Sequence, residues 1–364
     1  MMIVGLLCLA CYGIQRNVLP SGTASPPSPR SVVQDAGPVA PVGAATAADI
    51  DEPEDDGIDD ERAARLKVHP SGSRVAFTAE GDFSEEALSR GVRATRAQCD
   101  RVTAPMVVWV PTKGEEGECL KYWVAGFDKK PVGRALVFFH GDVWLGDGKT
   151  PKAYMGLNNE KLQRDADAWH KRVGVPYVFF GRPGTHGSSG DHMQRRRIGE
   201  SKLISAALDK IKERWGITEL VVAGQSGGGH VTASLITFRS DIVCAVPTSS
   251  PSSPHTRWVL RGRKKDNTGF TDSYEPAEHI DRATAHPQLH VFVLGNPSDT
   301  NVPWPSQTIL ADKLKVAGIP VKVLQGEGVG PYHHGLKNSS RVVAGWCAKG
   351  LSDDVIVQQA AKGL

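Results

Sequence analysis

Short apolar segments alternate with longer amphipathic segments through the main region of the chain, residues 131–364. Residues 198–215 give the clearest helical pattern, because their apolar side chains recur on one face of a helix. The apolar segments are predicted to be strands, at 135–139, 176–180, 219–223, 242–246, 290–294 and 320–324. Continuous apolar strands separated by amphipathic helices predict an α/β fold, with a mostly parallel central sheet and helices on both faces.

Three segments of different character precede this region. Residues 1–19 are a candidate signal or lipoprotein signal, because their apolar core runs into a Leu-Ala-Cys ending at Cys11, although no basic residue precedes that core. Residues 20–61 are rich in Pro and Ala and then acidic, which predicts a disordered linker. Residues 62–130 are predicted to be an amino-terminal extension with leading strands. These strands are expected at 74–79, 106–110 and 120–126.

The composition excludes a disordered or fibrous chain. The 364 residues are 40% hydrophobic and 23% charged, so there are enough apolar side chains to bury a core. The formal net charge of +3 hides an asymmetry, because residues 1–61 hold two basic side chains against ten acidic ones. The densest basic runs, 195–197 and 261–265, contain no aromatic side chains and match no nucleic-acid motif. They predict solvated faces, and no nucleic-acid partner is expected.

The six cysteines bear on the compartment of the protein. The four outside the apolar amino-terminal stretch form no C-x-x-C pair, so zinc and redox motifs are not indicated. Cys99 and Cys119 flank a predicted strand and are candidates for a bridge if the protein is exported to an oxidising compartment, and the sequence leaves open whether they are bridged. Cys244 lies in an apolar run and is predicted to be a small core residue.

The candidate signal and the linker favour export over a cytoplasmic location. The expected locations are periplasmic, secreted or envelope-anchored, with the amino terminus as a candidate membrane anchor. The alternative is a misassigned start in a cytoplasmic protein.

The strand predicted at 219–223 leads into the segment 224–230, Gly-Gln-Ser-Gly-Gly-Gly-His, and then into a predicted helix. A serine between glycines at a strand-to-helix turn can adopt the strained elbow that projects its hydroxyl from the sheet. Ser226 is therefore the candidate nucleophile. The helix that follows directs free N–H groups to the same place, so the N–H of Gly227 is the first candidate oxyanion donor.

A serine hydroxyl needs a base to take its proton. The segments after two later predicted strands contain candidate histidine bases and an aspartate that could orient one of them. Asp299 follows the fifth predicted strand and is placed to orient an imidazole; the alternative is that it is only a turn or capping residue. After the last predicted strand, a glycine-rich turn leads to His333 and His334. His334 is the preferred base, because Gly335 lets the loop fold back over the sheet. His333 is the alternative base.

The strand at 135–139 ends in His-Gly and a turn, in the place that supplies a second oxyanion donor. That donor is predicted to be the backbone N–H of Asp142 or Val143. A carboxylate beside a developing oxyanion would oppose it, so the Asp142 side chain is predicted to point away, toward an arginine. The alternative is that Asp142 is a turn residue in a non-catalytic loop.

The glycine-rich segment 181–192 follows the second predicted strand and so lies at the rim of the same edge. Arg182 or His186 is predicted to meet polar groups of a substrate; the alternative is a structural turn in which Arg182 pairs with Asp191. No phosphate-loop lysine follows, and the histidines lack other ligand types nearby, so no cofactor or metal is expected. Tryptophans near strand ends are candidate pocket walls, namely Trp144, Trp258 and Trp304.

Between residues 135 and 336 the chain resembles the α/β-hydrolase superfamily, and within it the catalytic domain of prolyl-oligopeptidase-like serine peptidases and the dienelactone-hydrolase-like enzymes. The stretches that carry the resemblance are FFHGD, GRPGTHGSSGDH, VVAGQSGGGH, LGNPSDTNVP and YHHGL. The chain order serine, aspartate, histidine is also that of the superfamily. The resemblance implies an acyl-enzyme mechanism on an ester, thioester or amide, with Ser226 as nucleophile, His334 as base and Asp299 as its orienting acid.

The predicted function is that of a serine hydrolase acting on a small-molecule ester or a peptide. Esterase and serine peptidase both stay open, although the propeller of the large oligopeptidases is missing. The alternative from another class is a catalytically inactive binding protein on the same fold. The sequence gives no oligomeric state.

Overall fold

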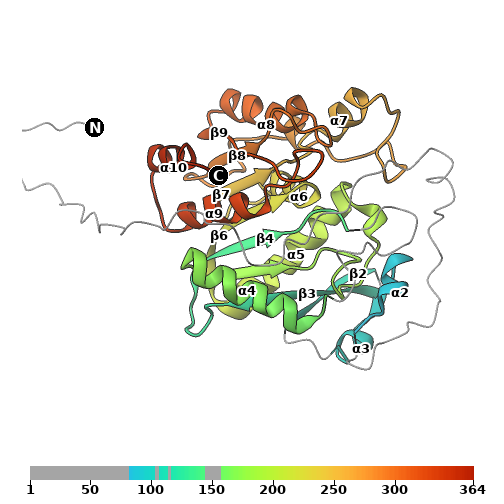
Figure 1. Ribbon diagram of the computed structural model, residues 1–364. Coiled ribbons are helices and arrows are strands. Elements are labelled where there is room, and N and C mark those ends of the chain that lie inside the picture. Colours follow the sequence, from blue (N-terminus) through green and yellow to red (C-terminus); the bar gives the residue numbers. More distant parts are fainter. Residues whose placement is uncertain (1–81, 103–105, 114–115, 144–156) are drawn as a thin grey trace, which may run out of the picture. The chain divides into compact units, whose positions relative to one another are not determined.

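The computed structural model describes residues 82–102, 106–113, 116–143 and 157–364 (Figure 1). All described residues belong to one compact unit. The predictions for the signal, the linker, the strand at 74–79 and Trp144 therefore lie outside the described residues.

A nine-stranded, mostly parallel sheet forms the centre of the described part of the chain. Its strands are β1 (Ala94–Thr95), β2 (Val107–Lys113), β3 (Glu116–Ala125), β4 (Gly133–Phe139), β5 (Tyr177–Phe180), β6 (Ile217–Gln225), β7 (Ile242–Thr248), β8 (His290–Gly295) and β9 (Val321–Gln325). The order across the sheet is β1-β3-β5-β4-β6-β7-β8-β9, and β2 pairs with β3. The pairs among β4 to β9 are parallel, whereas β1, β2 and β5 each pair antiparallel with β3.

Every strand predicted from residue 106 onward overlaps a strand of this sheet. The helices are α2 (Glu85–Ser89), α3 (Arg96–Cys99), α4 (Asn159–Val173), α5 (Ile198–Trp215), α6 (Gly227–Leu235), α7 (Pro254–Leu260), α8 (Trp304–Val316), α9 (Lys337–Ala348) and α10 (Asp353–Ala360), with short 3-10 helices at η1 (His192–Gln194) and η2 (Pro276–Glu278). Helix α5 has the bounds that its periodicity predicts. It ends at Gly216, whose φ of 66° is a left-handed conformation that glycine adopts at little cost.

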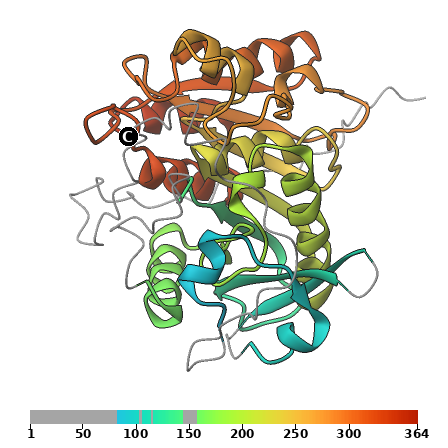
Figure 2. The same cartoon turned by 90° about the vertical axis from the view of Figure 1, so that its right-hand side faces the viewer.

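Helices cover both faces of the sheet. The apolar side chains of α5, α6 and α8 pack on one face, and those of α4, α9 and α10 pack on the other. Figure 2 shows α4 and α5 on opposite sides of the strands. Successive side chains of a strand point in opposite directions, so neighbouring residues pack on opposite faces of the sheet. Phe139 packs on one face and Phe138 on the other. The predicted fold class, a mostly parallel sheet between helical layers, is confirmed.

The amino-terminal extension joins this sheet through β1, β2 and β3. Its apolar side chains form a small separate cluster, which includes Cys99, Cys119 and also Val143 from the loop after β4. The backbone N–H of Cys119 donates to Ser189 Oγ (2.7 Å), and the N–H of Ser189 donates to the carbonyl of Cys119 (2.9 Å). The extension is therefore attached to two loops at the carboxyl ends of the central strands.

Two disulfide bonds link the described cysteines, Cys99 with Cys119 and Cys244 with Cys347. The first is the bridge expected for an exported protein. Cys244 is a buried core residue, as predicted, and it also joins β7 to α9 through its disulfide bond, which the sequence did not indicate. Among the described helices, none is both long and apolar enough to cross a bilayer.

Replacing both Cys244 and Cys347 by alanine is expected to lower the free energy of unfolding by roughly 2–4 kcal/mol, because the bond constrains an unfolded loop between residues 103 positions apart. Urea unfolding of the variant and the native chain, both kept oxidised, measures the difference. Thiol titration of the denatured native chain is the control, since neither cysteine of an intact bridge reacts. Equal unfolding free energies would contradict a stabilising role for this bridge.

Candidate active site

The turn between β6 and α6 holds Ser226 in a backbone conformation that serine rarely adopts. Its φ is 54° and its ψ is −122°, a strain of about 1–3 kcal/mol that persists only where the surroundings enforce it. The turn is tight: a Cβ at Gly224 would lie 2.3 Å from the carbonyl oxygen of Gly228, and a Cβ at Gly228 would lie 2.1 Å from that of Phe139. Glycine is required at both places, while Ser226 stays partly exposed at the end of its strand.

Asp299, in the loop after β8, binds the imidazole of His334, in the loop after β9. Asp299 Oδ2 lies 2.7 Å from His334 Nδ1, and both side chains are buried. Because a carboxylate accepts hydrogen bonds and does not donate them, Nδ1 carries the ring proton. The neutral ring then has its lone pair on Nε2, which is the atom that can take a proton from a hydroxyl.

Asp299 is itself held by three further donors. Its Oδ1 accepts the backbone N–H groups of Asn301 and Val302, each at 2.9 Å, and its Oδ2 accepts Gln307 Nε2 at 3.1 Å. The side chain thus closes the turn, as the alternative interpretation held, and also binds the imidazole. A carboxylate fixed at both oxygens gives the ring a defined orientation.

The structure pairs His334, and not His333, with Asp299. His333 is exposed and has a φ of 55°. His334 is also connected to the serine turn, because Gln225 Nε2 donates to the His334 carbonyl at 2.9 Å and Gln225 directly precedes Ser226. Ser226, Asp299 and His334 follow strands β6, β8 and β9, which are parallel, so all three residues lie at the carboxyl end of the sheet.

Two backbone N–H groups near Ser226 are available for an oxyanion. Gly227 is the first residue of α6, and the first N–H groups of a helix have no partner within it. The N–H of Val143 is directed to His192 Nε2, 3.4 Å away, whereas the N–H of Asp142 donates to no described residue. Of the two predicted second donors, the geometry therefore favours Asp142.

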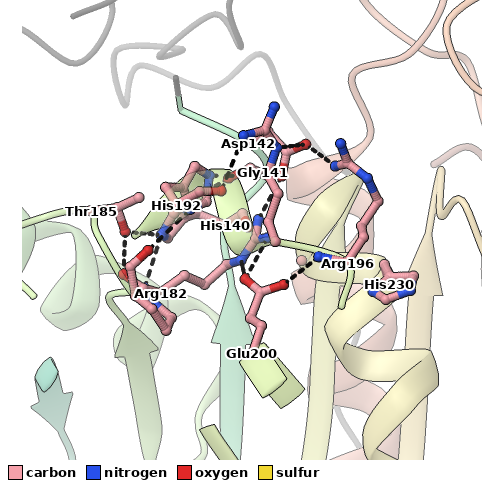
Figure 3. Close-up of polar contacts among 12 residues, drawn as sticks. His140, Gly141, Asp142, Arg182, Thr185, His192, Arg196, Glu200 and His230 are labelled. Carbon is pink, nitrogen blue, oxygen red and sulfur yellow. Dashed lines mark hydrogen bonds and ion pairs between the residues drawn. The ribbon is translucent and has the colours of Figure 1, made fainter. Parts of the chain in front are cut away.

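The side chain of Asp142 lies against the elbow and is bound by three buried arginines (Figure 3). Its Oδ1 accepts Arg182 Nη1 at 3.0 Å, and its Oδ2 accepts Arg195 Nε at 3.0 Å and Arg196 Nη1. Burial opposes the ionised form, but Arg196, Arg195 and Arg182 outweigh it and hold the pKa of Asp142 well below its usual range. The prediction that this side chain turns toward an arginine is confirmed.

Arg182 does not face a substrate. It is fully buried, and its Nε and Nη2 donate to Glu200 Oε1 at 2.9 and 2.7 Å. The expectation of a substrate contact is therefore wrong for Arg182, and so is the alternative partner Asp191. His186 is also buried, with its ring 4.3 Å from that of His140 between centroids, so its predicted contact with substrate is not supported by its position.

The basic run 195–197 is not a solvated face. Arg195 and Arg196 are each 1% exposed, and Arg196 forms a two-pronged ion pair with Asp266, at 2.9 and 2.7 Å. The prediction is wrong for Arg195 and Arg196, because each pairs with a carboxylate that lies far along the chain, Asp142 and Asp266 respectively. Arg197 is partly exposed and pairs with the exposed Asp272. The run 261–265, by contrast, is partly or fully exposed.

The buried His192 accepts a hydrogen bond from the loop after β4. His192 Nδ1 lies 3.1 Å from the carbonyl of Pro183, so it carries the proton, and Nε2 is free to accept the N–H of Val143. Burial, together with Arg182 and Arg195, keeps the pKa of His192 well below its usual value, which maintains the neutral ring that this contact needs.

Several residues that shape the site carry no sequence signal of their own. Glu200 and Asp266 appear as ordinary helix and loop acids, and Gln225 and Gln307 as unremarkable amides. The run of three arginines was the one available sign that buried carboxylates are needed nearby. Among the described residues, no group of three or more His, Cys, Asp or Glu side chains has the arrangement of a metal site.

Comparison with known proteins finds distant structural likenesses. No protein-family model and no curated protein sequence matches the chain. Est1E from Butyrivibrio proteoclasticus, solved with ferulic acid, is 16% identical over 70% of this chain and 99% of its own, with a TM-score of 0.46. The Pyrococcus furiosus esterase Pf2001 is 14% identical over 78% of this chain and 98% of its own, with a TM-score of 0.46. A puromycin-hydrolyzing peptidase from Mycobacterium tuberculosis is 18% identical over 68% of this chain and 40% of its own, with a TM-score of 0.49.

The chain has an α/β-hydrolase fold, recognised in its own coordinates. Its serine lies on a strained turn between a parallel strand and a helix, with the loop after β4 beside it. The residues that follow, Asp299 and then His334, occur in the chain order of that fold.

Replacing Gly227 by alanine is expected to lower kcat for an activated ester about 10²- to 10³-fold, as loss of an oxyanion donor does. The new Cβ would lie 1.9 Å from Asp142 Oδ1 and 2.7 Å from Arg182 Nη1, so the loop that carries the candidate second donor must move. Hydrolysis of p-nitrophenyl acetate measures the effect.

Gly199→Ala is the matched control, because a Cβ at Gly199 in α5 meets no atom within 4 Å. That variant should keep the native rate and stability. Equal activity of the two variants would show that the contact between Gly227 and Asp142 does not matter for the reaction.

Proposed function

We propose that this protein is a serine hydrolase that cleaves an ester or amide bond through an acyl-enzyme intermediate. Ser226 is the nucleophile, His334 the general base and Asp299 the carboxylate that orients it. The observation that carries the proposal is the buried 2.7 Å hydrogen bond between Asp299 and His334, at the sheet edge where the strained Ser226 turn lies.

The reaction follows from the placement of the proton. His334 Nδ1–H is bound to Asp299, so Nε2 accepts the proton of Ser226 while Oγ attacks the substrate carbonyl. The carbonyl oxygen gains the negative charge, and the N–H groups of Gly227 and Asp142 are the proposed donors to it. The imidazolium then returns its proton to the departing alcohol or amine. A water molecule, deprotonated by His334 Nε2, then attacks the acyl-enzyme, and the proton returns to Ser226 Oγ as the carboxylic acid is released.

The partly buried carboxylate of Asp142 does not oppose this charge, because its own charge is already compensated. Three arginines bind its two oxygens, and one of them, Arg182, also donates to the carbonyl of His140 at 3.2 Å. The loop that presents the second donor is thus held by ion pairs on one side and by His192 on the other. Such a preorganised donor needs no rearrangement as the reaction proceeds.

The substrate class we propose is a small-molecule ester or a peptide, with ester hydrolysis the simpler chemistry. We further propose export to an oxidising compartment, whether periplasmic, secreted or held at the envelope. The support for export is the pair of disulfide bonds, since such bonds persist outside reducing cytosol.

Ser226→Ala is expected to abolish labelling by a fluorophosphonate probe and to reduce ester turnover to background, because the nucleophile is removed. Asp299→Asn should retain the fold and lower kcat by roughly 10⁴, because an amide can stabilise the wrong imidazole tautomer. Labelling in gel and p-nitrophenyl acetate kinetics measure the two effects.

His333→Ala serves as the control for the choice of base and should retain native turnover, whereas His334→Ala should not. A folded native chain that neither labels nor hydrolyses any short activated ester would contradict the proposal and favour a binding protein on this fold. Paired substrates with the same acyl group, one an ester and one an anilide, then distinguish esterase from amidase activity.

A further inference from the structure

The carbonyl oxygen of His334 receives two hydrogen bonds from buried side chains. Gln225 Nε2 and Ser249 Oγ each donate to it at 2.9 Å, and both residues are fully buried. Gln225 ends β6, and Ser249 follows β7, the neighbouring strand in the sheet. The loop that carries the imidazole is therefore bound from two adjacent strands that do not belong to it.

Gln225 holds this loop on both sides of Gly335. While its Nε2 donates to the His334 carbonyl, its Oε1 accepts the backbone N–H of Leu336 at 2.9 Å. A primary amide is suited to this position, because it donates and accepts at once. An aliphatic side chain would leave both backbone groups buried without these partners, and a carboxylate cannot donate to the carbonyl.

Ser249 is held in place at a cost in backbone strain. Its φ is 42°, in the left-handed region that serine rarely occupies, and its N–H donates to the carbonyl of Leu294 at 2.8 Å. Glycine would adopt this conformation freely. The hydroxyl directed at His334 gives a reason for a serine here.

We propose that Gln225 and Ser249 are positioning residues that fix the backbone of His334 relative to Ser226. The inference rests on the proposed function and extends it, since neither residue is part of the triad. Gln225 is adjacent to Ser226 in the chain, so a single side chain connects the nucleophile's strand to the base's loop. The bond to Asp299 sets which way the ring faces, whereas these two donors set where its backbone lies.

Ser249→Gly is the sharper of two tests, because it separates positioning from stability. The variant loses the Oγ donor but relieves the backbone strain, so its melting temperature should be equal to or above that of the native chain. Its kcat for p-nitrophenyl acetate should fall about three- to tenfold with KM unchanged, the scale expected for one lost hydrogen bond in the catalytic step. An unchanged kcat in a folded variant would overturn the role of Ser249.

Gln225→Met removes both contacts with little change in volume and should lower kcat about 10- to 100-fold, because small misplacement of a catalytic group is costly. Gln163→Met is the matched control: Gln163 Nε2 also donates to a backbone carbonyl, that of Val124 at 2.8 Å, but on α4. It should keep the native kcat. A Gln225→Met variant with native kcat, or an equal loss in the control, would overturn the role of Gln225.

A measurement that does not need turnover keeps this inference separate from the proposed function. The proton on His334 Nδ1, bound to Asp299, is expected to give a far-downfield NMR resonance. Ser249→Gly and Gln225→Met should shift or broaden this resonance, while Gln163→Met should leave it unchanged. If the native chain shows neither labelling nor turnover, the proposed function fails, and this resonance still tests the positioning. If the native chain is active and the resonance is the same in all variants, the positioning inference fails alone.

Discussion

The buried hydrogen bond between Asp299 and His334 is the contact on which the rest of the candidate site depends. It selects one tautomer of the imidazole, and that selection defines which ring nitrogen can serve as a base for Ser226 in the proposed reaction. The bond can form only because β8 and β9 are neighbours and parallel, so that the loops after both strands emerge at the same edge. The position of the carboxylate is in turn fixed by backbone and amide donors, which leaves the ring little freedom.

Charge balance is the second constraint, and it acts on the loop after β4. Three buried guanidinium groups, from Arg182, Arg195 and Arg196, meet three carboxylates, from the partly buried Asp142 and from the buried Glu200 and Asp266. A buried ion without a partner would be strongly destabilising, so each member of such a network depends on the others. This network connects the loops after β4 and β5 with α5 and with the segment around residue 266. An anionic side chain can therefore lie beside the proposed oxyanion site without adding net negative charge to it.

Features that follow from local sequence could be predicted, and features that depend on a distant partner could not. The apolar runs predict the strands, and Ser226, Asp299 and His334 are candidates because each lies in the segment after such a run. Arg195 and Arg196 were assigned to the surface because their carboxylates lie more than 50 positions away, at separations of 53 and 70. Cys244 has its partner 103 positions away. A pattern of neighbours carries no information about either contact.

The cluster shared by the extension and Val143 bears on how the protein can be divided. A shortened chain that starts at residue 131 would retain Ser226, Asp299 and His334, but it would lack the apolar support of Val143 and the strand that pairs with the outer side of β5. The sheet and the loop after β4 are thus shared between the extension and the α/β region. Recombinant boundaries, and any exchange of this region between related proteins, are better placed ahead of residue 82 than at the point where the hydrophobic pattern changes.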